Sequence, residues 1–181
     1  TLGGIGVGNI GREVFLLAQP FGMRHLAYDP FVDPASVADL GIELVDLDTL
    51  LTESDFVTIS VPLSDNTRHL VGEQEIRKMK PTAYLINTSR GPIVQTDALV
   101  DALRKSAIAG AGMDVFDEEP IAQDHPLLAL DNVVLTPHLG YSSLEGLRNF
   151  YRGAVENIRS WAAGELTNVA NQDVLGSERK A

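Results

Sequence analysis

Residues 4–11 read Gly-Ile-Gly-Val-Gly-Asn-Ile-Gly, directly after a short apolar start. Gly6, Gly8 and Gly11 form the pattern G-x-G-x-x-G, which is typical of a dinucleotide-binding strand–turn–helix unit. In that unit Gly6 permits a tight turn, Gly8 lets the backbone approach a pyrophosphate, and Gly11 lets the helix pack close to the strand. The N-terminus of the helix then offers N–H groups and a partial positive charge to the phosphates.

The residues after the motif support this interpretation. Apolar residues at helical spacing follow it, and Pro20 and Gly22 end that helix. The apolar face is predicted to carry Val14, Leu17 and Ala18. Residues 24–28 form a second predicted strand that ends at Asp29. An acid there accepts hydrogen bonds from the adenosine ribose and repels a 2′-phosphate, so NAD is favoured over NADP. Asp29 also begins an Asp-Pro turn, and the two roles are compatible.

Composition narrows the class of protein. The chain has 181 residues, a 44% hydrophobic fraction and a formal net charge of −11, which suits one domain with a sizeable core. The negative charge disfavours nucleic acid or an anionic membrane as a partner. No apolar run approaches the roughly 20 residues that span a bilayer. The absence of cysteine excludes disulfides and thiol nucleophiles and fits a cytoplasmic location. No spacing of His, Asp and Glu suggests a metal site.

Strands and helices alternate along the chain. This pattern predicts an α/β fold, a Rossmann-type doubly wound parallel sheet with helices on both faces. Further strands are expected at residues 43–45, 56–61, 83–87, 108–115 and 133–136. Helix starts are expected at Asp46, at Thr96 as an N-cap, and at Ser142 or Ser143, with the last helix reaching about Ala163 before Gly164. Residues 1–164 are expected to form an NAD(P)-binding domain, and residues 165–181 a return segment toward a further domain.

Three charged side chains each follow a predicted strand: Arg90, Glu119 and His138. The carboxyl ends of parallel strands meet at one edge of the sheet, where ligands bind. Taken singly, each residue is typical of a solvated loop. Together they suit oxidation of an alcohol next to a carboxylate, with His138 as base, Glu119 orienting it and Arg90 gripping the carboxylate. The other histidines are interpreted as structural or solvated: His25, His69 and His125.

Six motifs in order resemble the D-2-hydroxyacid dehydrogenases, and in particular the cofactor domain of that family. The motifs are Gly6-Val7-Gly8-Asn9-Ile10-Gly11, Tyr28-Asp29-Pro30, Val61-Pro62-Leu63 with Thr67, Asn87-Thr88-Ser89-Arg90-Gly91, Asp114-Val115-Phe116 with Glu119-Pro120, and Thr136-Pro137-His138. The resemblance implies an oxidoreductase that transfers a hydride between NAD(H) and a small D-2-hydroxy acid or 2-oxo acid. It runs from Thr1 to about Ala163.

The resemblance also implies residue roles. Arg90, Glu119 and His138 are the expected catalytic set. The expected cofactor-binding residues are Gly6, Gly8, Asn9, Ile10, Gly11, Asp29, Val61, Pro62, Thr67, Thr88, Ser89, Arg90, Asp114, His138 and Gly140. Thr88 and Asp114 would hold the nicotinamide end. Many members carry Arg or His in place of Asn9, and His in place of Ser60.

The partners follow from the same resemblance. A small 2-hydroxy or 2-oxo acid is the expected substrate, and a homodimer through this domain is the expected assembly. Because the chain starts at Thr1 and lacks the family's substrate-binding domain, we expect a fragment that binds the cofactor but turns over poorly. An NAD-sensing, corepressor-like binding module of the same fold is the alternative.

Overall fold

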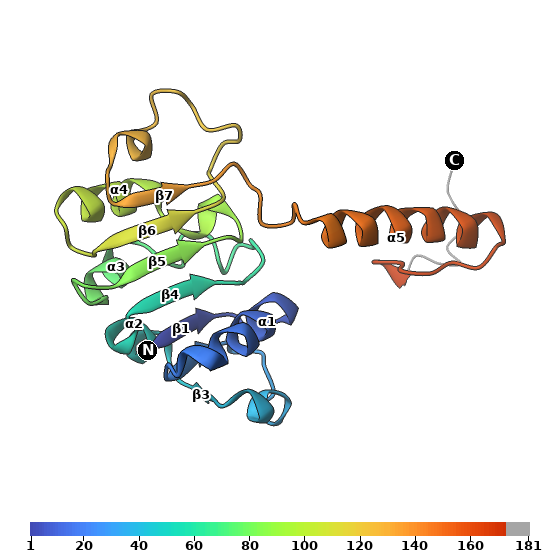
Figure 1. Cartoon of the computed structure of the whole chain (residues 1–181), viewed down its shortest axis with the longest axis horizontal. Helices are drawn as coiled ribbons and strands as arrows, with labels where there is room; N and C mark the ends of the chain where they lie inside the picture. Colours follow the sequence, from blue (N-terminus) through green and yellow to red (C-terminus); the bar gives the residue numbers. More distant parts are fainter. Residues whose placement is uncertain (173–181) are drawn as a thin grey trace. The chain divides into compact units, whose positions relative to one another are not determined.

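The computed structural model describes residues 1–172, which fall into two compact units, Thr1–Leu139 and a second unit that begins at Gly140. The later part of the predicted return segment, residues 173–181, lies outside the described residues. The first unit is built on a seven-stranded sheet in the order β3-β2-β1-β4-β5-β6-β7 (Figure 1). All neighbouring strands are parallel. The predicted doubly wound α/β fold is therefore confirmed.

The strands match their predicted positions within a few residues. They are β1 Leu2–Ile5, β2 His25–Tyr28, β3 Ile42–Leu44, β4 Phe56–Ile59, β5 Tyr84–Asn87, β6 Gly110–Met113 and β7 Val133–Leu135. The helices are α1 Asn9–Ala18, α2 Leu47–Glu53, α3 Glu73–Lys78, α4 Thr96–Arg104 and, in the second unit, α5 Leu144–Ala162. The strand order reverses between β1 and β4, and ligands of such sheets bind beyond the carboxyl ends of the strands at that point.

Strand β1 shows why helices cover both faces. Successive side-chain positions of the strand point to opposite faces of the sheet, as in any strand. A Cβ added to Gly3 would meet Leu50 of α2, whereas one added to Gly4 would lie 2.5 Å from the ring of Phe15 in α1. Two separate hydrophobic clusters result, one built around α2, α3 and α4 and one around α1.

The buried face of α1 differs from the predicted one. The helix buries Gly11, Phe15 and Ala18, whereas Leu17 is 73% exposed. Positions 11, 15 and 18 follow the i, i+4, i+7 spacing of one helix face. The prediction of Leu17 was wrong because Phe15 fills the space that the missing side chain of Gly4 leaves on the sheet.

Two of the helix starts are confirmed, and two differ from the sequence analysis. Asp46 accepts from the N–H of Thr49 at 2.7 Å, and Ser143 accepts from the N–H of Gly146 at 2.9 Å. Thr96 was wrong as an N-cap, because Gln95 occupies that position and Thr96 is the first residue of α4. Helix α3 was not predicted, because Ile76 is its single buried residue and its other five residues are charged or polar.

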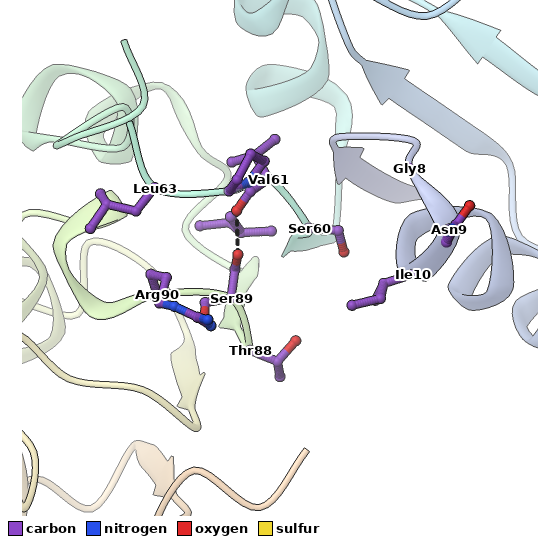
Figure 2. Close-up of a pocket in the computed structure, with 11 residues that line it drawn as sticks. Gly8, Asn9, Ile10, Ser60, Val61, Leu63, Thr88, Ser89 and Arg90 are labelled. Carbon is purple, nitrogen blue, oxygen red and sulfur yellow. Dashed lines mark hydrogen bonds between the residues drawn. The ribbon is translucent and has the colours of Figure 1, made fainter. Parts of the chain in front are cut away.

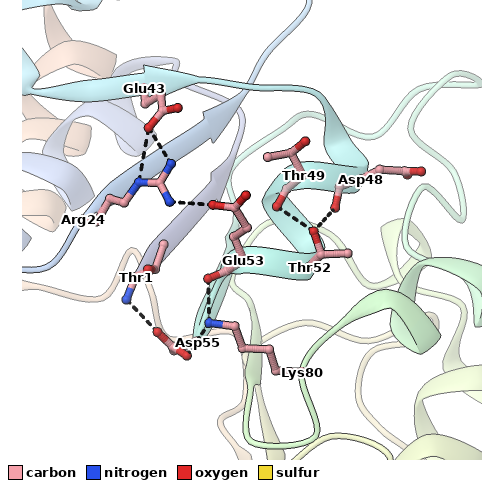
Figure 3. Close-up of polar contacts among 9 residues, drawn as sticks. All are labelled: Thr1, Arg24, Glu43, Asp48, Thr49, Thr52, Glu53, Asp55 and Lys80. Atoms are coloured by element: carbon pink, nitrogen blue, oxygen red, sulfur yellow. Dashed lines mark hydrogen bonds and ion pairs between the residues drawn. The ribbon is translucent and has the colours of Figure 1, made fainter.

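A polar network joins β2, β3, α2 and β4 (Figure 3). Arg24 pairs with Glu43 at 2.6 Å and with Glu53 at 2.5 Å. Lys80 donates to the carbonyl of Glu53 at 2.7 Å and pairs with Asp55 at 2.8 Å. The hydrogen bond from Lys80, together with one from the amino group of Thr1, lowers the pKa of Asp55 to about 2.

The second unit contains α5, whose side chains within the described residues are half-buried or exposed. Its exposed apolar residues include Leu144, Phe150, Tyr151, Val155, Ile158 and Trp161. Gly164, at a φ of +76°, follows the helix as expected. Among residues 1–172 no helix is both long enough and apolar enough to cross a membrane. The same residues form no group of three or more His, Asp or Glu side chains that could hold a metal ion.

Candidate active site

The three motif glycines have different surroundings. Gly6 has a φ of +93°, and an added Cβ would lie 2.7 Å from the carbonyl oxygen of Ser60. A Cβ on Gly11 would lie 2.3 Å from the carbonyl oxygen of Gly6. A Cβ on Gly8 would meet no atom within 4 Å. Gly6 and Gly11 are therefore required for backbone packing, whereas Gly8 faces open space at the start of α1.

A cleft of about 560 Å³ opens at the point where the strand order reverses (Figure 2). Gly8, Asn9 and Ile10 lie on one side of it, and Thr88, Ser89 and Arg90 lie on the other. Ser60, Val61, Pro62 and Leu63 complete the lining. The first turn of α1 leaves backbone N–H groups without intrahelical partners, so this wall of the cleft is suited to an anion.

A second cleft of about 610 Å³ shares Gly8 and residues 60–62 with the first. Its own lining includes Tyr28, Asp29, Pro30, Phe31, Asn66 and Thr67. The two clefts therefore adjoin at Gly8 and residues 60–62. Two adjoining clefts beside the N-terminus of a helix suit a dinucleotide, whose pyrophosphate binds at such a terminus.

Asp29 holds the glycine loop in place. One carboxylate oxygen accepts from the N–H of Val7 at 2.9 Å, and the other accepts from the N–H of Phe31 at 3.0 Å. The second bond closes the Asp-Pro turn that the sequence predicted. Each carboxylate oxygen has further acceptor capacity, so a ribose contact is compatible with both bonds.

The loop after β4 is fixed by hydroxyl groups. Thr67 donates to the carbonyl of Pro62 at 2.7 Å and accepts from the N–H of Ser64 at 2.8 Å. The hydroxyl of Ser89 donates to the carbonyl of Val61. Thr67 and Ser89 thus shape the cleft wall through the backbone.

Glu119 and His138 form a pair, although 19 residues separate them. Oε2 of Glu119 lies 2.7 Å from Nδ1 of His138, and Oε1 accepts from the N–H of Phe116 at 3.0 Å. The bond with His138 is the main cause that lowers the pKa of Glu119, followed by the Phe116 N–H and, more weakly, the charge of Arg90. Glu119 is therefore ionised near neutral pH, and a carboxylate can only accept, so Nδ1 of His138 carries the proton.

Arg90 lies beside this pair at the same edge of the sheet. It follows β5, lines the first cleft and donates to the carbonyl of Ser89 at 2.7 Å. Its charge is close enough to Glu119 to affect the titration of that carboxyl. The three sequence-predicted catalytic residues thus follow β5, β6 and β7 at one sheet edge.

Asp114 fixes the loop that carries His138. The Asp114 side chain is buried, and it accepts from the N–H of Leu139 at 2.7 Å and from the hydroxyl of Thr136 at 2.5 Å. Its carbonyl accepts from the N–H of His138 at 2.8 Å. His138 has a φ of +54°, and these bonds hold it in that uncommon conformation.

Asn87 is a site residue to which sequence reasoning assigned no role. Its buried amide donates to the carbonyl of Arg90 at 2.9 Å and accepts from the N–H of Ser89 at 3.0 Å. An Asn that ends a buried strand before a Thr-Ser-Arg-Gly turn was the available signal, because Asn side chains bond to the backbone of such turns.

The remaining residues singled out in the sequence are Gly140, as a cofactor-binding candidate, and the three histidines outside the expected catalytic set. Gly140 belongs to the second unit. The ring of His25 is buried against Phe15, with ring centroids 5.3 Å apart, and His125 accepts from the N–H of Leu127 at 3.3 Å. His69 is exposed. The interpretation of these three histidines as structural or solvated is confirmed.

The family comparison agrees with this geometry. Residues 1–140 match the family model described as D-isomer specific 2-hydroxyacid dehydrogenase, NAD binding domain. The chain belongs to this family. NAD is therefore the cofactor of this domain, and the resemblance drawn from the six motifs is confirmed.

Individual relatives are similar over nearly the whole chain. A glyoxylate reductase of Korarchaeum cryptofilum is 47% identical over 97% of the chain and 53% of the relative. A D-3-phosphoglycerate dehydrogenase of Methanocaldococcus jannaschii is 41% identical over 99% of the chain and 34% of the relative. The structure of D-lactate dehydrogenase from Aquifex aeolicus with NAD and lactic acid has a TM-score of 0.83 at 36% identity, over 91% of this chain and 54% of that one. The chain spans about half the length of most of these relatives.

Proposed function

We propose that this chain is the cofactor-binding half of an NAD-dependent dehydrogenase that interconverts small D-2-hydroxy acids and 2-oxo acids. The observation that carries the proposal is the Glu119–His138 pair at 2.7 Å, beside Arg90 and the dinucleotide-shaped cleft. A base, its orienting carboxylate and a guanidinium at one edge are the groups that this reaction needs.

His138 exchanges the proton of the substrate hydroxyl. Because Nδ1 is held by Glu119, the exchange is assigned to Nε2. In oxidation, Nε2 takes the hydroxyl proton as the carbon–hydrogen bond of the same carbon breaks. A nicotinamide held in this cleft would supply the acceptor for that hydrogen, which leaves as a hydride. The carboxylate of Glu119 stabilises the imidazolium that results, and reduction of a 2-oxo acid reverses each step.

Arg90 binds the carboxylate of the substrate. A guanidinium presents two parallel donors to a carboxylate, which fixes the orientation of the neighbouring carbon. In the described structure the Arg90 side chain donates to the carbonyl of Ser89 at the cleft wall, within reach of the cleft.

The remaining residues hold the cofactor. The N–H groups of Asn9 and Ile10 bind the pyrophosphate, Asp29 binds the adenosine ribose, and Thr88 and Asp114 hold the nicotinamide end. Val61, Pro62 and Thr67 line the cleft, and Gly140 follows the catalytic loop.

We also propose that the protein is a cytoplasmic homodimer. Light scattering of the purified chain is expected to give twice the mass of one chain.

Binding and turnover are tested separately. Titration of the 181-residue chain with NADH and NADPH, followed by nucleotide fluorescence, is expected to show preference for NADH because of Asp29. Equal affinity for the two would contradict the role of Asp29. Turnover is measured in a longer form of the protein that also carries the part of the relatives that this chain does not match. Glyoxylate and other small 2-oxo acids are the probes.

His138→Gln is the decisive variant of the longer form. We expect unchanged NADH affinity and a kcat lower by at least about 100-fold, because general acid–base catalysis is lost. His69→Asn is the matched control, since His69 is exposed and Asn tolerates its positive φ. Turnover by His138→Gln at the wild-type rate would overturn the proposal. NADH-dependent oligomerisation without any turnover would favour the NAD-sensing alternative.

A further inference from the structure

Two contacts attach the Glu119 loop to the part of the chain that follows Arg90. A Cβ added to Gly91 would lie 2.0 Å from the carbonyl carbon of Phe116 and 2.5 Å from the N of Asp117, so the two backbones touch. The hydroxyl of Thr96 then donates to the Asp117 carboxylate at 2.6 Å. Residues 116 and 117 are thereby held from two sides.

The Thr96–Asp117 bond suits the start of α4. Thr96 is the first residue of that helix, and a carboxylate near a helix N-terminus is stabilised by the helix dipole. Asp117 belongs to a loop outside the helix, so the bond ties the loop to a rigid element. The sequence spacing of 21 residues shows that this is a tertiary contact.

The held residues connect directly to the catalytic pair. The N–H of Phe116 donates to one oxygen of Glu119 at 3.0 Å, and the other oxygen meets His138 at 2.7 Å. A displacement of residues 116–117 would therefore move the Glu119 carboxylate away from the imidazole.

We infer that Thr96 and Asp117 are positioning residues, whose hydrogen bond fixes the Glu119 carboxylate against His138. The geometric part of this inference stands on the contacts alone, and its catalytic part rests on the proposed function. Neither residue touches the substrate or the cofactor in the proposed function.

The first test measures the titration of the Glu119 carboxyl by ¹³C NMR in the 181-residue chain. The charged groups that act on this carboxyl are His138 and Arg90. Asp117 and Glu118 are the other acidic residues of its own loop. Thr96→Val keeps the shape of Thr96 and removes its hydroxyl. We expect it to raise the pKa of Glu119, because the bonds from His138 and Phe116 that lower this pKa are weakened.

Three further variants make the result specific. Thr96→Ser restores the hydroxyl and is expected to restore the Glu119 titration. Thr52→Val removes a threonine hydroxyl bond on the exposed face of α2, the 2.9 Å bond to the carbonyl of Asp48, and is expected to leave that titration unchanged. Thr96→Ala gives the same result as Thr96→Val and replaces it where valine impairs folding, which thermal unfolding reports.

The second test uses the longer form. Thr96→Val is expected to lower kcat about ten-fold without changing the Kd for NADH, because a small displacement of a catalytic group costs rate rather than cofactor affinity. A Glu119 titration in Thr96→Val identical to that of the wild type would overturn the inference. A wild-type longer form without turnover would instead contradict the proposed function and leave the NMR result intact.

Discussion

Gly8 and Gly11 belong to the same motif, but a glycine is needed at each position for a different reason. The backbone of Gly11 is so close to Gly6 that any side chain would collide with a carbonyl oxygen. Gly8 has room for a side chain, and it is one of the residues that line the cleft. One glycine serves packing, and the other leaves space that a pyrophosphate could occupy.

A pair of alanine variants separates these requirements. Gly11→Ala is expected to lower the free energy of unfolding by about 1–3 kcal/mol, because the added methyl overpacks a helix–strand contact. Gly8→Ala is expected to leave stability nearly unchanged and to weaken NADH binding. Urea denaturation and fluorescence titration of both variants check this. Wild-type NADH affinity in Gly8→Ala would show that the open space beside Gly8 is not part of the cofactor site.

At the scale of elements, charge networks connect segments that hydrophobic packing leaves at the surface. Lys80 links the end of α2 to the start of β4 through the Glu53 carbonyl and the Asp55 carboxylate. The pKa of Asp55 falls from 3.8 to about 2 in the folded chain. Because the folded-state pKa is lowered, the stabilising contribution is fully present above about pH 4 and is lost as pH falls toward about 2.

Lys80→Met is expected to lower the urea midpoint at pH 5 and to flatten its fall between about pH 4 and pH 2. The substitution removes the largest cause of the lowered pKa of Asp55, so the folded and unfolded pKa values of that carboxyl come closer and less stability is lost as the pH falls. Urea midpoints measured in steps between pH 5 and pH 2 follow the change. Lys105→Met is the control, since Lys105 pairs with Asp101 on an exposed face of α4. An acid profile of Lys80→Met that coincides with the control would contradict the role of Lys80.

At the scale of the whole molecule, the cleft depends on segments that are distant in the sequence. Residues 8–10, 60–63 and 88–90 line it together, and the folded sheet brings them side by side. The unfolded chain has no such cleft. A ligand that binds the folded state alone stabilises it by mass action.

NADH is therefore expected to stabilise this chain against urea. At 100 times its Kd, the gain in the free energy of unfolding is about 2.7 kcal/mol. Urea denaturation with and without NADH measures the gain, and NADPH at the same concentration is expected to give a smaller one. Stabilisation by NADH that persists in Gly8→Ala would place the binding site elsewhere.

Local signals in the sequence were sufficient for much of the fold. The sequence correctly predicted the strand–turn–helix unit at the glycine motif, the strands at the apolar runs, and the caps Asp46 and Ser143. Each of these features depends on residues that are close together in the chain. Leu17 and Thr96 were misjudged because their surroundings are set by Gly4 and Asp117, which are distant in sequence.

The sequence by itself determined the alternation of strands and helices and the type of side chain at each strand end. Backbone preferences and hydrophobic period are local properties, so a single chain reveals them. The sequence analysis expected Glu119 to orient His138, and the structure brings the two side chains to 2.7 Å. Only the tertiary structure decided that Asp114 holds the His138 loop and that the backbone of Gly91 touches residues 116 and 117. These contacts follow from strand order and from the close packing of loops, because they join segments that no local spacing relates.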